Sequence, residues 1–142
     1  MPRILIVDDD AKNADLLEAH LDGSGYDTKV VYSGEDALAA ARDWTPDVIL
    51  LDVMMPKVSG FDVCQQLRAA PATKGVSVLM VTALDEATDV EKAVNAGTDD
   101  FITKPINKTE LLLRVRAMLD SRKHAGDVDR TLAYLGRVQQ GV

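Results

Sequence analysis

Short apolar runs alternate along the chain with longer segments in which apolar residues recur every three or four positions. Five runs have the length and composition of buried strands: RILIV (3–7), DTKVV (27–31), DVILLD (47–52), VSVLMVT (76–82) and DFIT (100–103). The segments between and after them have a helical period and predict helices over 11–23, 34–44, 60–69, 86–96 and 108–123. In the first helix we expect the apolar stripe to comprise Ala14, Leu16, Leu17, Ala19 and Leu21.

Residues that begin and end helices stand at these predicted boundaries. Ser33 followed by Asp36 is a helix-start signal, and Asn107 followed by Glu110 has the residue types and spacing of a capping box. Glycines stand where helices should stop: Gly23, Gly25 and Gly97. The boundaries therefore support the alternation of strands and helices that the apolar pattern predicts.

Five alternations of strand and helix predict parallel strands joined by right-handed crossovers, with helices on both faces of the sheet. The first, third and fourth runs are the most apolar, as central strands buried on both faces should be. The sequence thus predicts one α/β domain with a doubly wound sheet and three layers, α/β/α.

In such sheets, ligands bind at the carboxyl ends of the strands near the point where the strand order reverses. The residues at those ends are Asp8 and Asp9, Asp52, Thr82 and Lys104. Carboxylates that converge in one cleft need a cation, and oxygen ligands without His or Cys suit Mg²⁺, with Mn²⁺ as a second possibility. Because an amine and a hydroxyl suit phosphoryl oxygens, the set indicates phosphoryl transfer.

Composition and charge narrow the classes of protein. The chain is 46% hydrophobic and 27% charged, as is ordinary for a globular protein. Residues 1–100 carry a net charge of −11 and residues 101–142 carry +4, so we expect no direct binding of nucleic acid by this domain. The single cysteine, Cys64, fits a reducing compartment, and no apolar run is long enough for a membrane span or signal peptide. We therefore expect a cytoplasmic protein.

Four stretches, IVDDD, LDVMMPKVSGFDVC, MVTA and AGTDDFITKPINKTEL, resemble in order and spacing the receiver domain of bacterial two-component response regulators, of which chemotaxis regulators are one kind. The resemblance covers about residues 2–122 and implies a flavodoxin-like sheet with strand order 2-1-3-4-5. It assigns residues 1–123 to the receiver domain. Residues 124–142 would then be a C-terminal helical extension or a linker to an output domain.

The resemblance also implies roles for single residues. Asp52 would accept the phosphoryl group, and Mg²⁺ would be held by Asp8, Asp9, Asp52 and the backbone carbonyl of Met54. Thr82 and Lys104 would contact the phosphoryl oxygens, Thr82 and Phe101 would form the switch, and the Lys104–Pro105 peptide bond would be cis.

The implied protein is a signalling switch and not an enzyme with an external substrate. Its phosphodonor would be a sensor histidine kinase or a histidine phosphotransfer protein, in a two-component system or phosphorelay. Phosphorylation would change the face made by the fourth helix, the fifth strand and the fifth helix. That face would then control a homodimer, an output domain or a protein partner. No cofactor other than the metal and no membrane contact are expected.

Two other hypotheses use the same acidic strand end. In a phosphatase of the haloacid-dehalogenase class, Asp8 and Asp10 would form the Asp-x-Asp pair, with Asp8 as nucleophile. That hypothesis leaves LDVMMP unexplained. A flavin-binding module of the same fold would need a phosphate-cradling loop where this chain has acids that repel phosphate. Asp10 immediately precedes the first helix, so we expect it to cap that helix rather than to bind metal.

Overall fold

The computed structural model describes residues 1–83 and 87–122 of the 142-residue chain. The chain divides into two compact units, Met1–Pro105 and Ile106–Val142. The predicted extension at 124–142 lies outside the described residues, so the proposed boundary after residue 123 stays a prediction. Within the described residues, no helix is both long enough and apolar enough to cross a membrane.

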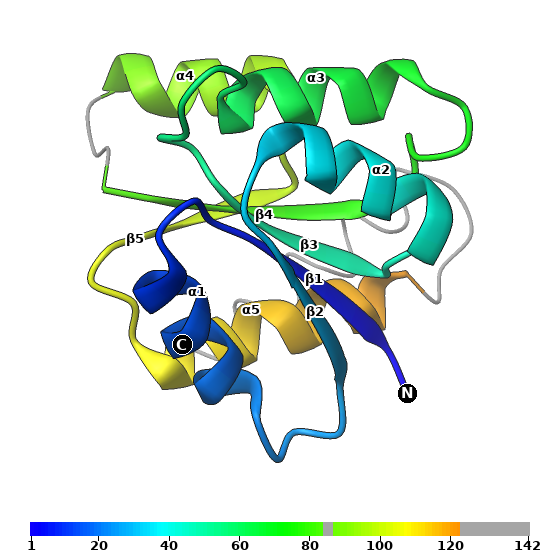
Figure 1. Ribbon diagram of the computed structural model, residues 1–142. Coiled ribbons are helices and arrows are strands. Elements are labelled where there is room, and N and C mark those ends of the chain that lie inside the picture. Colours follow the sequence, from blue (N-terminus) through cyan, green and yellow to red (C-terminus); the bar gives the residue numbers. More distant parts are fainter. Residues whose placement is uncertain (84–86, 123–142) are drawn as a thin grey trace. The chain divides into compact units, whose positions relative to one another are not determined.

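The first unit contains a parallel sheet in the order β2-β1-β3-β4-β5 (Figure 1). Its strands are β1 (Arg3–Val7), β2 (Asp27–Val31), β3 (Val48–Asp52), β4 (Ser77–Thr82) and β5 (Asp100–Thr103). Each strand falls within one residue of its predicted run, and the three most apolar runs occupy the centre of the sheet. The flavodoxin-like order is thereby confirmed.

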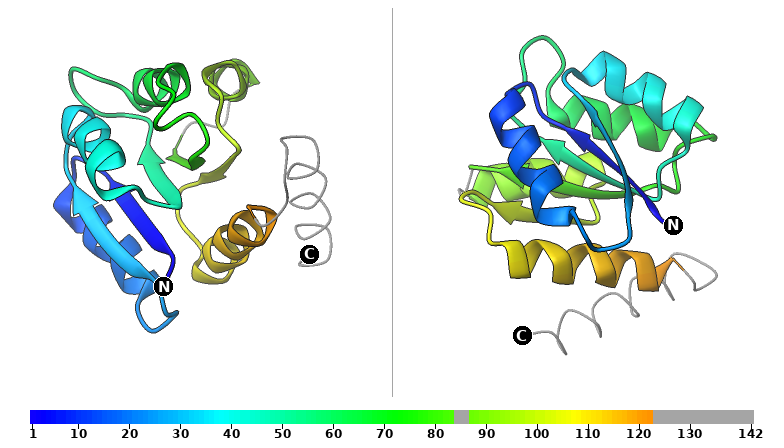
Figure 2. Two further views of the ribbon diagram at one scale, coloured as in Figure 1. Left: turned by 90° about the vertical axis from the view of Figure 1, so that its right-hand side faces the viewer. Right: turned by 60° about the horizontal axis from the view of Figure 1, so that its bottom comes forward.

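Helices lie on both faces of this sheet, as predicted. The helices of the first unit are α1 (Ala11–Leu21), α2 (Gly34–Trp44), α3 (Gly60–Ala69) and α4 (Ala87–Ala96). Figure 1 shows α2, α3 and α4 on one face and α1 on the other, and the left view in Figure 2 shows α1 apart from the other three helices. Because strand side chains alternate, Leu5 and Val7 of β1 enter the core beneath α2 and α3, while Ile4 and Ile6 point to the opposite face.

One part of the α1 prediction is wrong. Ala14, Leu17 and Leu21 are buried as expected, whereas Leu16 is 53% exposed and Ala19 is exposed. With about 100° of rotation per residue, positions 14, 17 and 21 share one face of the helix, and positions 16 and 19 do not. The buried stripe is therefore narrower than the apolar composition indicated.

The predicted helix starts are confirmed by their caps. The Asp10 side chain accepts a hydrogen bond from the Lys12 N–H at 2.9 Å, and Ser33 Oγ accepts one from the Asp36 N–H at 3.1 Å. In the second unit, Asn107 caps α5 (Lys108–Ser121) by accepting from the Glu110 N–H at 3.0 Å. Each side chain satisfies an N–H that has no partner inside its helix.

Arg68 of α3 fixes the starts of the last two strands. Its Nε donates to the Gly97 carbonyl at 2.8 Å, and its Nη2 pairs with Asp99 at the same distance. The Asp99 carboxylate also accepts from the Val78 N–H at 2.7 Å. Since β5 runs from this anchor toward Lys104, these contacts help to position the lysine at the other end of the strand.

Candidate functional site

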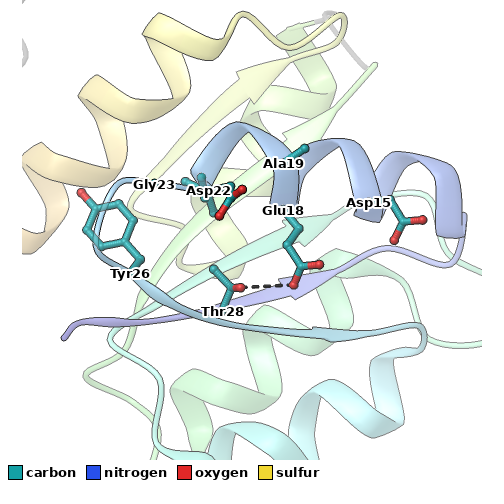
Figure 3. A pocket seen from close by; sticks show the side chains of 8 residues that line it. Asp15, Glu18, Ala19, Asp22, Gly23, Tyr26 and Thr28 are labelled. Carbon is teal, nitrogen blue, oxygen red and sulfur yellow. Dashed lines mark hydrogen bonds between the residues drawn. The ribbon is translucent and has the colours of Figure 1, made fainter.

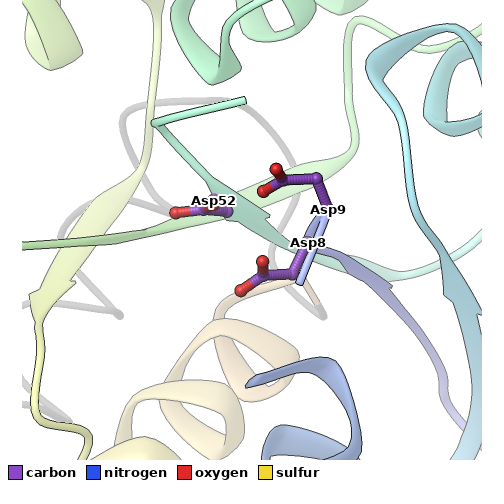
Figure 4. A group of neighbouring side chains, drawn as sticks. All are labelled: Asp8, Asp9 and Asp52. Carbon is purple, nitrogen blue, oxygen red and sulfur yellow. The ribbon is translucent and has the colours of Figure 1, made fainter. Parts of the chain in front are cut away.

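Three aspartates meet at the carboxyl edge of the sheet. β1 pairs with β3 in a register that sets Val7 beside Leu51, so Asp8 and Asp52 follow as neighbours at the same edge. Asp8, Asp9 and Asp52 each offer a carboxylate oxygen, and these oxygens lie within 4.8 Å of one another (Figure 4). Asp8 and Asp52 are only 1% and 4% exposed, whereas Asp9 is exposed. The prediction that these three strand-end acids converge is confirmed.

Lys104 brings positive charge to this acidic cluster. Its Nζ lies 3.4 Å from Oδ1 of Asp52 and 3.8 Å from Oδ2 of Asp8. Its backbone N–H donates to the Thr82 carbonyl at 2.7 Å, which joins the ends of β4 and β5. Thr82 itself is buried at the end of β4, 6% exposed. All five side chains predicted from strand ends thus belong to adjacent strand ends of one sheet.

Burial raises the pKa of both inner carboxyls. Desolvation, followed by the charge of Asp8, raises the pKa of Asp52 from 3.8 to about 6, with Lys104 opposing the shift. Desolvation also raises the pKa of Asp8, while the hydrogen bond that its Oδ1 accepts from the Asp10 N–H acts in the other direction. One lysine therefore leaves the negative charge of the cluster incompletely balanced.

The donor set fits a hard divalent cation. Oδ2 of Asp8 is buried without a hydrogen-bond partner, and Lys104 at 3.8 Å is too distant to supply one. A buried carboxylate oxygen in this condition costs free energy unless a cation compensates for it. Three carboxylates with no His or Cys in the cluster suit Mg²⁺ or Mn²⁺ rather than a softer metal.

The remaining predicted site residues lie near strand ends with different surroundings. Met54, two residues after β3, has a 65% exposed side chain. Phe101 of β5 is half-buried and packs against the hydrophobic core. The peptide bond between Lys104 and Pro105 is cis, as the resemblance implied. The Asp10 carboxylate is outside the acidic cluster and caps α1, so the three consecutive aspartates differ in their surroundings.

Two features at the start of α3 were not predicted from the sequence. Ser59 and Asp62 form a reciprocal capping box at the start of α3, a Ser-x-x-Asp pattern that could have been recognised. The second feature is Gly60, the first residue of α3. A Cβ there would clash with the Asp52 carbonyl oxygen and would lie 2.8 Å from Cα of Val53. This close approach of α3 to the phosphoacceptor candidate could not be inferred from sequence.

A separate hollow lies between α1 and the start of β2 (Figure 3). It is lined by Asp15 and Glu18 of α1, by Asp22 at the C-cap of that helix, and by Tyr26 and Thr28. Glu18 accepts a hydrogen bond from the Thr28 hydroxyl at 3.1 Å, and both Asp15 and Asp22 are exposed to solvent. Because these acids are solvated or hydrogen-bonded, the hollow lacks the desolvated charge that distinguishes the strand-end cluster.

The fold and this site together define a class: flavodoxin-like domains with a cluster of acids at the carboxyl ends of the strands. Residues 4–116 match the response regulator receiver domain family. The chain belongs to that family, and it is a receiver domain of two-component signalling.

The relatives give the same result. The chain is 46% identical over 119 residues to the DNA-binding dual master transcriptional regulator RpaA of Synechocystis, covering 84% of this chain and 49% of RpaA. It is 47% identical over 117 residues to the DNA-binding response regulator MtrA of Mycobacterium tuberculosis, covering 82% and 50%. A CheY-like receiver domain protein from Methanospirillum hungatei superposes with a TM-score of 0.82 at 28% identity, covering 89% and 99%. The chain thus spans about half the length of the two curated relatives.

Proposed function

We propose that this chain is a phosphorylation-dependent switch that accepts a phosphoryl group on Asp52. The observation that supports this most directly is the burial of the Asp52 carboxylate beside both Asp8 and the Lys104 ammonium. The donor is the phosphohistidine of a sensor histidine kinase or of a histidine phosphotransfer protein. An Asp52 oxygen forms a bond to phosphorus while the bond from phosphorus to the histidine nitrogen breaks, and the freed imidazole takes up a proton.

The metal in this proposal is Mg²⁺, with Mn²⁺ able to replace it. Asp8, Asp9, Asp52 and the backbone carbonyl of Met54 hold it, and the orphaned Oδ2 of Asp8 supports this assignment. The bound ion supplies positive charge that neutralises the carboxylates and the phosphoryl oxygens. Asp52 can then approach an anionic phosphodonor despite the acids around it.

Lys104 and Thr82 contact the phosphoryl oxygens after transfer. The lysine already lies 3.4 Å from Asp52, so a phosphoryl group there would find its ammonium nearby. Thr82 moves toward the phosphate, and Phe101, which packs half-buried beside β4, turns inward in response. Through α4, β5 and α5, this change controls a homodimer, an output domain or a protein partner.

The names of two relatives, RpaA and MtrA, concern the output that the switch would control. RpaA and MtrA are named as DNA-binding regulators, and this chain spans about half of each. The strongly acidic residues 1–100 repel a phosphate backbone. We therefore place any contact with DNA in a separate output domain or partner, and not in the receiver domain.

A single labelling experiment tests the proposal. The chain is treated with a small phosphodonor such as acetyl phosphate and with Mg²⁺, and its intact mass is measured. We expect one phosphoryl group per chain, retained in the control Asp10→Asn and lost in Asp52→Asn. The phosphatase hypothesis finds no support in the comparisons. It predicts the opposite result: label that persists in Asp52→Asn and disappears in Asp8→Asn.

A further inference from the structure

The loop after β3, residues 53–59, is closed tightly on itself. The Gly60 N–H donates to the Val53 carbonyl at 2.9 Å, so the two ends of the loop meet. Because Gly60 has no side chain, the first turn of α3 can lie against the backbone of Asp52 and Val53. A displacement of this loop would therefore directly shift the backbone of Asp52, the candidate phosphoacceptor.

The tip of the loop has a strained conformation. The Val58 N–H donates to the Pro56 carbonyl at 2.8 Å, and Lys57 between them has a φ of 68°. This is a γ-turn with its central residue in the left-handed region, which costs free energy for any residue except glycine. Such a turn persists only where surrounding contacts determine it. The contacts of Val58 are thus part of what fixes the shape of the loop.

Gly34, the first residue of α2, leaves the space in which the Val58 side chain packs. A Cβ on Gly34 would lie 2.9 Å from Cβ of Val58 and 2.9 Å from Cγ2 of Val63. Both valines pack against the core, and their branched side chains have few alternative rotamers. The backbone of Gly34 is outside the left-handed region. The position therefore needs glycine for space and not for conformation.

We propose that Gly34 is a positioning residue for the metal site, acting through Val58 on the loop that carries Met54. Gly34 contacts neither the carboxylates nor the transferred group. Because Gly34 has no side chain, Val58 can pack against it, and this packing stabilises the γ-turn. The turn then fixes the backbone that supplies the Met54 carbonyl. This inference rests on the proposed function, in which that carbonyl is a metal ligand.

The test is a calorimetric titration of the full chain with Mg²⁺. Gly34→Ala forces the loop tip outward, and we expect its Mg²⁺ affinity to fall on the order of tenfold, as when residues that orient metal ligands are changed. Gly75→Ala is the matched control, because a Cβ there meets nothing within 4 Å. Its affinity should equal that of the original chain. Equal affinities for Gly34→Ala and Gly75→Ala would overturn the proposal.

A double-mutant cycle distinguishes the proposed effect of Gly34, which acts through Val58, from a general loss of packing. Val58→Gly leaves the space beside Gly34 empty and should also weaken Mg²⁺ binding. In Gly34→Ala with Val58→Gly, the new methyl group occupies the vacated space, so the affinity should recover above that of either single variant. Losses that simply add in the double variant would contradict the proposal.

Two further results would decide whether the role of Gly34 or the proposed function itself is wrong. If Gly34→Ala does not fold, Val58→Gly alone decides, and an unchanged affinity in that variant overturns the inference. If the original chain neither binds Mg²⁺ nor takes a phosphoryl group on Asp52, the proposed function itself fails. Normal binding and phosphorylation of the original chain, with normal binding in both single variants, would contradict only the role of Gly34.

Discussion

The Nζ of Lys104 lies 3.4 Å from Oδ1 of Asp52, and this pair joins the end of β5 to the end of β3 across β4. The same ammonium lies 3.8 Å from Asp8, so one cation faces two desolvated carboxylates. Burial holds the pKa of Asp52 at about 6 despite this lysine. The site is therefore built with less positive charge than its acids require, which favours the binding of a further cation.

Removing the Lys104 charge should affect metal binding and phosphorylation in opposite directions. Lys104→Met keeps much of the side-chain volume but deletes the cation nearest Asp52. We expect Mg²⁺ affinity to rise slightly, because repulsion of the ion is lost, and phosphorylation by acetyl phosphate to slow by roughly tenfold or more. Lys74→Met, at an exposed position between α3 and β4, is the matched control. A parallel fall in both quantities would contradict the assignment.

The raised pKa of Asp52 predicts a pH dependence of stability in metal-free protein. The folded state binds this proton more tightly than the unfolded state, with pKa values of about 6 and 3.8. The contribution of Asp52 is therefore most favourable below pH 3.8 and is lost as the pH rises through 6. At higher pH, Asp52→Asn should be more stable than the original chain, by at most about 3 kcal/mol.

Urea unfolding with a chelator present, across that pH range, measures this difference. The advantage of Asp52→Asn should shrink toward zero in acid, and saturating Mg²⁺ should reduce it at neutral pH. An advantage that is independent of pH would show that the Asp52 charge is not its cause.

Asp10 should contribute to the stability of the folded protein and not to Mg²⁺ binding. Asp10→Ala removes the hydrogen bond to the Lys12 N–H and should destabilise the protein by about 1 kcal/mol. Its backbone N–H, which donates to Asp8, remains in place. Mg²⁺ affinity should therefore change little, whereas Asp9→Ala should weaken it strongly. Calorimetry on both variants checks this, and Asp10→Ser should retain the cap.

The left-handed Lys57 should be a site of stored strain. Lys57→Gly relieves the φ of 68° and should raise the free energy of unfolding by up to about 1 kcal/mol, less the entropy that glycine adds to the unfolded chain. Lys57→Ala removes the charge but keeps the strain, so it is the control. Equal stability of the Gly and Ala variants, measured by urea unfolding, would contradict the presence of strain.

Much of this site could be predicted because parallel strands end at one edge. Asp8, Asp52 and Thr82 follow apolar runs, and that pattern alone placed them together. Leu16 was misplaced because composition was given more weight than the angular position around the helix. The packing of Val58 against Gly34 joins two separate elements, and the approach of Gly60 to Asp52 depends on how the β3–α3 loop folds back on itself, so neither contact could be predicted from the sequence. Only packing in three dimensions reveals such distances.

The central claim is that the phosphoryl group resides on Asp52. The chain is phosphorylated with acetyl phosphate and Mg²⁺, reduced with borohydride and digested, and the peptides are sequenced by mass spectrometry. Borohydride converts an aspartyl phosphate to homoserine and leaves free aspartate unchanged. We predict homoserine at position 52 alone, dependent on both phosphodonor and metal. Homoserine at position 8, or at no position despite phosphoryl incorporation, would contradict the account.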